Sequence, residues 1–144
     1  MPKFPLKYQV NLEADAKITN KWNCTANSGE KVVCAVPPEF NGPGHSFTPE
    51  DFFALAILNC IVAAFKVLLE KRKETCQLIK GQAILNLDIN QADNNLYFTE
   101  IDISIEVKGA SNKETVKKLL EQAVAICPAS GAAKTSKTHH LNVS

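Results

Sequence analysis

One long apolar segment constrains the fold of this chain more than any other feature. Thr48 is a good N-cap, Pro49 suits the first helical position, and the two acidic residues that follow place negative charge against the unsatisfied amides of the first turn. The pattern predicts a helix from Pro49 to about Arg72. Residues 52–65 are apolar on nearly every face, and a helix that is hydrophobic all round must be buried all round.

The rest of a 144-residue chain offers little material to cover such a helix. A sheet covers only one side of it, and few other elements remain. We therefore predict a homodimer in which the helix of residues 49–72 is central, because a partner subunit would supply the missing cover. The alternative is that a second helix of the same chain covers it alone.

Extended segments lie before this helix. Residues 6–36 contain three strand-like stretches separated by weak turns, and they predict a strand meander. Residues 37–47 contain three prolines and two glycines, which favour a surface loop over regular structure. The loop leads directly into the helix.

A hairpin, a second helix and an edge strand are predicted after the first helix. Residues 81–90 and 96–109 read as two strands that flank a polar loop. Residues 112–126 have the periodicity of an amphipathic helix that ends before a proline, and residues 139–144 read as a last edge strand. The order βββ-α-ββ-α-β predicts a single antiparallel α+β domain over residues 1–144.

Composition excludes several classes of protein. The formal net charge of +1 argues against a dedicated nucleic-acid or anionic-membrane binder. The apolar run of residues 52–65 is shorter than the roughly 18 residues that span a bilayer, which predicts a soluble protein. Five cysteines cannot all pair within one chain, and a domain of this size needs no disulfides, so we expect reduced thiols and a cytoplasmic location.

The sequence predicts neither a metal site nor a bound cofactor. It contains no C-x-x-C pair, and His45, His139 and His140 stand at no metal-binding spacing from any cysteine. We therefore interpret the histidines as loop or edge-strand residues. No glycine loop has the phosphate-binding pattern either.

The cysteines are the remaining candidates for chemistry. Three lie in or beside strands or at a helix exit and are interpreted as structural thiols: Cys24, Cys34 and Cys76. Cys60 lies in the middle of the apolar helix, where it is either a buried core thiol or a reactive thiol that needs a cationic partner. Cys127 precedes a proline, and the resulting break in the backbone places it as a resolving thiol would be.

Two motifs resemble those of the OsmC/Ohr family, the osmotically inducible and organic hydroperoxide resistance proteins. The first is the helix start Thr48-Pro49-Glu50, with Cys60 ten residues after the glutamate. The second, 67 residues after Cys60, is Cys127-Pro128-Ala129-Ser130, the C-P-x-S of the family. The loop PPEFNGPG is similar to that of the less characterised OsmC-like branch.

The resemblance implies an intertwined homodimer in which antiparallel sheets pack on two central helices, and it implies a thiol-dependent peroxidase. In the family, the cysteine that matches Cys60 attacks an organic hydroperoxide and becomes a sulfenic acid, and the one that matches Cys127 condenses with it to a disulfide. An external dithiol, often a lipoylated protein, then reduces the disulfide. The glutamate that matches Glu50 orients an arginine that holds the attacking sulfur as a thiolate.

The family arginine is missing from its expected place. Every basic residue before the helix is a lysine or a histidine, and the single arginine, Arg72, lies three turns beyond Cys60. Lys21 and Lys31 are the candidate replacements, although a lysine lacks the planar fork of an arginine. This departure keeps two alternatives open: a non-enzymatic OsmC-like protein that binds a small ligand, and a thiol redox sensor.

Overall fold

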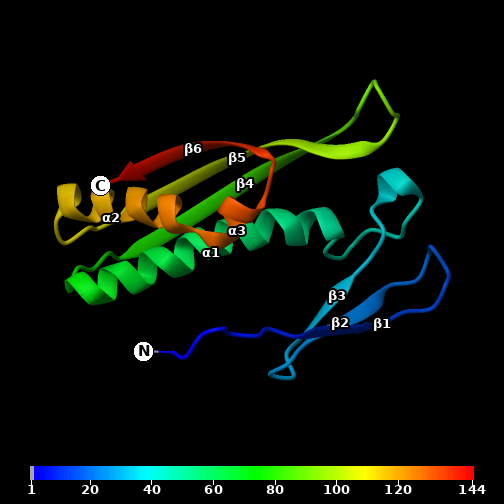
Figure 1. Cartoon of the computed structure of the whole chain (residues 1–144), viewed down its shortest axis with the longest axis horizontal. Helices are drawn as coiled ribbons and strands as arrows, with labels where there is room; N and C mark the ends of the chain where they lie inside the picture. The colour runs from blue at the N-terminus through cyan, green and yellow to red at the C-terminus, as the bar shows by residue number, and fades with distance from the viewer. Residues whose placement is uncertain (1) are drawn as a thin grey trace. The chain divides into compact units, whose positions relative to one another are not determined.

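The computed structural model describes residues 2–144, which form two compact units (Figure 1). The first unit ends at Phe52, and the second runs from Phe53 to Ser144. The α+β fold class is confirmed, and the elements follow the predicted order with two short helical segments added. The single domain over residues 1–144 stays a prediction.

A three-stranded antiparallel sheet makes up much of the first unit. Its strands pair in chain order: Val10–Glu13 (β1), Trp22–Ala26 (β2) and Lys31–Cys34 (β3). Leu12 pairs with Cys24, and Trp22 pairs with Cys34. The meander predicted over residues 6–36 is therefore confirmed, with shorter strands than the sequence pattern indicated.

The loop after β3 is held by local contacts. It contains one 3-10 turn, η1 (Pro38–Phe40), and a hydrogen bond of 2.9 Å joins the Ala35 N–H to Phe47 O. A glycine is required at position 42, because a Cβ atom on Gly42 would lie 1.8 Å from Val36 O. The loop thus returns the chain to the end of β3 just before the long helix begins.

The long helix α1 spans Pro49–Arg72, as its start signal predicts. Thr48 and Asp51 cap it reciprocally: the Asp51 N–H donates to Thr48 Oγ1 at 3.2 Å, and the Thr48 N–H donates to Asp51 Oδ2 at 2.9 Å. Basic side chains occupy its last turn, where their positive charge interacts favourably with the negative end of the helix dipole. Both ends of this helix are therefore set by local sequence.

The second unit contains a three-stranded mixed sheet. Its strands are Leu78–Ile89 (β4), Leu96–Lys108 (β5) and Ser136–Val143 (β6), with β5 in the centre. β4 and β5 form the predicted antiparallel hairpin, and β6 lies at the edge as predicted. However, β6 runs parallel to β5, so the expectation of purely antiparallel sheets is wrong for this pair. The reason is the helical connection between them, which returns the chain to the end of the sheet where β5 began.

Two helices form this connection. The helix α2 (Lys113–Ile126) is capped by Asn112, whose Oδ1 accepts the Thr115 N–H at 3.0 Å. A single residue, Cys127, separates α2 from the five-residue helix α3 (Pro128–Ala132). Helices α1 and α2 cover the same face of the second sheet (Figure 1).

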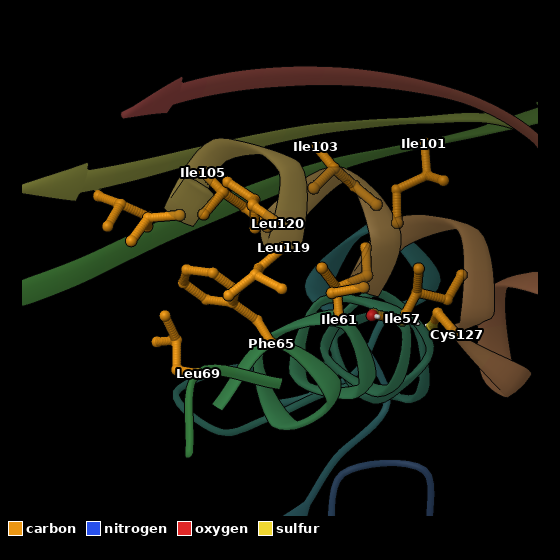
Figure 2. Close-up of a cluster of buried hydrophobic side chains, with 13 residues drawn as sticks. Ile57, Ile61, Phe65, Leu69, Ile101, Ile103, Ile105, Leu119, Leu120 and Cys127 are labelled. Atoms are coloured by element: carbon orange, nitrogen blue, oxygen red, sulfur yellow. Dashed lines mark hydrogen bonds between the residues drawn. The ribbon is translucent and has the colours of Figure 1, made fainter. Parts of the chain in front are cut away.

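The hydrophobic core of the second unit lies where α1, α2 and β5 meet (Figure 2). Alternate residues of β5 point into it, as the period of a strand with one buried face predicts. Its buried members are Ile57, Ile61, Phe65, Leu69, Ile101, Ile103, Ile105, Val107, Val116, Leu119, Leu120, Ala123 and Cys127.

Helix α1 is buried along one stripe only. The stripe recurs every four residues from Ile57 to Leu69, whereas Ala56, Asn59 and Ala63 on the opposite side are exposed. The alternative in which α2 alone covers α1 is therefore wrong, because α2 leaves this side open.

Helix α1 also has the length and composition of a membrane-spanning helix. Its mean hydropathy is 2.4 over an 18-residue window, so the apolar part of the helix is longer than the run of residues 52–65 indicated. Core helices of soluble proteins meet the same two criteria. Only 33% of that window is buried inside the chain, but its buried stripe packs against β5 and α2, and on that packing we interpret α1 as a core helix.

Candidate active site

Cys127 lies at the break between α2 and α3. Its backbone is extended, with φ −63° and ψ 112°, as the residue before a proline prefers. It also caps α3, because its Sγ accepts the Ser130 N–H at 3.4 Å. The predicted break is confirmed, and the side chain of Cys127 is buried, at 3% exposure.

The sulfur of Cys127 reaches helix α1. Its thiol donates to Ile57 O over 3.9 Å, and Figure 2 shows Cys127 beside Ile57 at one end of the core cluster. Cys60 lies about one turn further along α1 and is only partly buried. The Cys60 thiol is near enough to act on the ionisation of Cys127. The fold therefore brings together two cysteines that are 67 residues apart in the sequence.

The two thiols have different environments. Burial raises the pKa of the Cys127 thiol, and Cys60 raises it further through a hydrogen bond and through its charge. The N–H groups of Ser130 and Ala129 lower it by less. Cys60 is thus partly exposed, whereas Cys127 is buried and its raised pKa favours the protonated thiol. Two neighbouring thiols of this kind can pass between a dithiol and a disulfide state.

Glu50 lies in the first turn of α1, within the first unit. Its Oε2 atom is buried and finds no hydrogen-bond partner among residues 2–144. Burial raises the pKa of the Cys34 thiol, and Cys24, Glu50 and Asp51 raise it further through their negative charges, so Cys34 lies near the start of α1. A buried carboxylate oxygen without a donor is costly, which leaves Glu50 suited to receive a cation.

The arginine and the two candidate lysines lie in different parts of the chain. Arg72 ends α1, twelve residues after Cys60 or about 18 Å along the helix axis. Lys21 Nζ donates to His45 O at 2.8 Å, in the loop just before α1. Lys31 begins β3 and is exposed. Lys21 is therefore the lysine of the two that is tied to the segment leading into the helix.

All five cysteines are free thiols. Cys24 and Cys34 lie on β2 and β3, and Cys76 follows α1, where burial raises its pKa. The interpretation of these three as structural thiols stays a prediction.

The histidines lie apart from the two thiols in the sequence. His140 Nε2 lies 2.8 Å from Asp102 Oδ1. His139 faces the other side of β6, where burial, then the charges of Lys137 and His140, lower its pKa. His45 adopts a left-handed φ of 53° in its loop. Within residues 2–144, no group of three or more histidine, cysteine or acidic side chains is arranged to hold a metal ion.

Residues 42–142 match the sequence profile of the family described as OsmC-like protein, which is well over half of the chain. The chain belongs to this OsmC-like family. The resemblance drawn from the Thr48-Pro49-Glu50 and Cys127-Pro128-Ala129-Ser130 motifs is thereby confirmed.

Known proteins similar to this OsmC-like chain cover nearly its whole length. An uncharacterized protein of Acinetobacter baylyi is 27% identical over 132 residues, which are 89% of this chain and 90% of that protein. An OsmC-like protein of unknown function from Vibrio cholerae has a TM-score of 0.80 at 14% identity, over 95% of this chain and 99% of that one. An organic hydroperoxide resistance protein OsmC from Legionella pneumophila has a TM-score of 0.69 at 19% identity, over 99% of both chains. These likenesses establish the fold.

The sequence did not reveal the contacts that hold Cys127. The Ser130 N–H belongs to the C-P-x-S motif, so the motif contained a signal for that contact. The Ile57 carbonyl belongs to no motif, and a backbone carbonyl leaves no trace in a sequence.

Proposed function

We propose that this OsmC-like protein is a thiol-dependent peroxidase that reduces organic hydroperoxides, with Cys60 as the peroxidatic and Cys127 as the resolving cysteine. The observation that carries the proposal is the adjacency of a partly exposed thiol on α1 and a buried thiol at the start of α3. In this proposal the first thiol meets the peroxide, and the second closes a disulfide with it.

The proposed reaction has two balanced steps. The Cys60 thiolate attacks a peroxide oxygen, the O–O bond breaks, and the leaving alkoxide takes a proton to become an alcohol, while Cys60 becomes a sulfenic acid. The Cys127 sulfur then attacks the sulfenic sulfur, and the displaced hydroxyl leaves with the thiol proton as water. The peroxide gains two electrons and the pair of thiols loses two.

An external dithiol completes the proposed cycle. It reduces the Cys60–Cys127 disulfide by exchange, and the vicinal dithiol of a lipoylated protein has the required chemistry. No bound cofactor is needed in this scheme. A reduced resting dithiol also requires a reducing compartment, so we propose a cytoplasmic location.

Glu50 and Lys21 are the proposed cation site. The negative charge of Glu50 acts on Cys34, and Cys34 pairs with Trp22, which follows Lys21 in the sequence. Lys31, by contrast, begins β3 at the end opposite to Cys34. An ammonium has three donors, so the hydrogen bond of Lys21 to a loop carbonyl leaves two for other acceptors. The unpartnered oxygen of Glu50 is a suitable acceptor. Lys21 would then lie beside Glu50, as the arginine does in the family.

An aromatic pair supports organic hydroperoxides as the substrate class. Phe53 stacks on Phe98 with ring centroids 4.5 Å apart. Phe53 lies seven residues before Cys60, which is about two turns, so both side chains share one side of α1. Apolar surroundings on the side of the reactive thiol favour an organic peroxide over a small polar one.

We also propose that the protein is a homodimer with α1 at its centre. The side of α1 that carries Ala56 and Ala63 is open within one chain. In the first unit, Val10 and Leu12 of β1 remain 79% and 66% exposed. A second copy is the fitting occupant, because a two-fold contact can cover the same open surfaces on both chains at once.

A thiol count tests the proposed function. Reduced protein treated with one equivalent of cumene hydroperoxide is expected to lose two of its five thiols per chain. Mass spectrometry without reduction should locate the new bond between Cys60 and Cys127. No thiol loss over minutes would contradict the peroxidase and favour a ligand-binding protein. Thiol loss without steady turnover in the presence of a dithiol would favour a redox sensor.

A further inference from the structure

Lys137 binds the turn that follows α3, the short helix that Cys127 caps at its start. Its Nζ atom donates to Ala133 O at 2.7 Å and to Thr135 O at 2.8 Å, and both contacts are partly buried. Ala133 is the residue that ends α3. The last carbonyl groups of a helix have no hydrogen-bond partner inside it. The ammonium of Lys137 supplies a donor to one of them, and its positive charge interacts favourably with the negative end of the helix.

Helix α3 needs such anchors because it has only five residues, and a helix this short is not stable by itself. At its start, Cys127 accepts the Ser130 N–H on its sulfur and the Gly131 N–H on its carbonyl oxygen, the latter at 3.1 Å. At its end, Lys137 joins the turn to β6, where Lys137 pairs with the fully buried Ile101 of β5. Lys137 thus adds a tie between the end of α3 and the strand that pairs with the centre of the sheet.

We propose that Lys137 is a positioning residue for the resolving step, because it holds α3 so that the Cys127 sulfur stays beside Cys60. The proposal rests on the proposed function. Lys137 acts through the turn and takes no part in bond formation. Without its ammonium, the C-terminal end of α3 loses one of its anchors, and Cys127 spends less time within reach of the Cys60 sulfenic acid. A second hydroperoxide then has time to oxidise that sulfenic acid to a sulfinic acid, and a second alcohol is released.

The chain offers matched variants for this test. Lys137→Met removes the charge and the donors but keeps a long side chain, and Lys137→Arg keeps both. Lys134→Met is the control, because Lys134 lies in the same loop and is exposed.

The first measurement separates the two chemical steps. In Lys137→Met, disulfide formation after a pulse of cumene hydroperoxide is expected to slow roughly tenfold, within the hundredfold that a misplacement of 1 Å can cost. Formation of the sulfenic acid, trapped with dimedone, should keep its rate, and the sulfinic fraction should rise with excess peroxide. Lys137→Arg and Lys134→Met should behave as the unmodified protein. Disulfide formation at the unmodified rate in Lys137→Met would overturn the proposal.

The second measurement needs no peroxide. Cys127 and Cys34 are 3% and 2% exposed, so both should resist alkylation in the reduced protein. Lys137→Met is expected to speed alkylation of Cys127 roughly tenfold, the scale set by losing hydrogen bonds to a charged group, and to leave Cys34 protected. Equal acceleration at both cysteines, or at neither, would overturn the proposal. If the unmodified protein consumes no hydroperoxide, the proposed function fails, while this measurement still decides whether Lys137 positions Cys127.

Discussion

Cys60→Ser is expected to abolish hydroperoxide reduction. In the proposed reaction the Cys60 sulfur takes the peroxide oxygen, and a serine hydroxyl is a weak nucleophile when no base activates it. Cys127→Ser should behave differently: Cys60 still reacts with the first equivalent, but no disulfide forms and sulfinic acid accumulates. Turnover is measured as the loss of cumene hydroperoxide in the presence of dihydrolipoamide.

Cys76→Ser is the matched control for this experiment. Cys76 is also a partly buried free thiol of the second unit. The control should retain the turnover of the unmodified protein. Hydroperoxide loss in Cys60→Ser above the rate without protein would exclude Cys60 as the peroxidatic residue. Equal losses of activity in Cys60→Ser and Cys76→Ser would point to an effect on folding.

The parts of the fold that the sequence predicted well are those with local causes. Helix α1 begins at Pro49 because Thr48 and Asp51 cap it, and all of these residues lie within one turn of each other. The direction of β6 was predicted wrongly because it depends on the route of the chain through α2 and α3. An alternating pattern shows that a strand has a buried face, but it does not show which way a neighbouring strand runs.

The candidate site also has one part that the sequence predicted and another that depends on packing. Cys60 and Cys127 were found from motifs, and the proline after Cys127 explained the backbone break that the structure contains. The contact of the Cys127 thiol with Ile57 O joins residues 70 positions apart, and it depends on how α3 packs on α1. Distances of this kind follow from packing of the whole unit. A sequence motif therefore names the sulfur atoms, while the second unit brings them together.

Phe65→Ala is expected to lower the free energy of unfolding by about 3–5 kcal/mol, the largest effect on stability from a single change in this core. Phe65 is fully buried, and it is the largest of the fully buried side chains. It lies in the stripe of α1 that packs against β5 and α2, so its removal leaves a cavity at the centre of the second unit. Urea unfolding should show a lower midpoint with an unchanged slope.

Lys66→Ala is the matched control, because it changes the next residue of α1 on a different side of the helix. Lys66 is exposed, and its truncation should change the free energy of unfolding by no more than about 0.5 kcal/mol. Both variants must be compared at one protein concentration, since the apparent stability of the proposed dimer would depend on it. A cost below about 1 kcal/mol for Phe65→Ala, far under the usual range for a buried phenylalanine, would contradict the assignment of this stripe to the core.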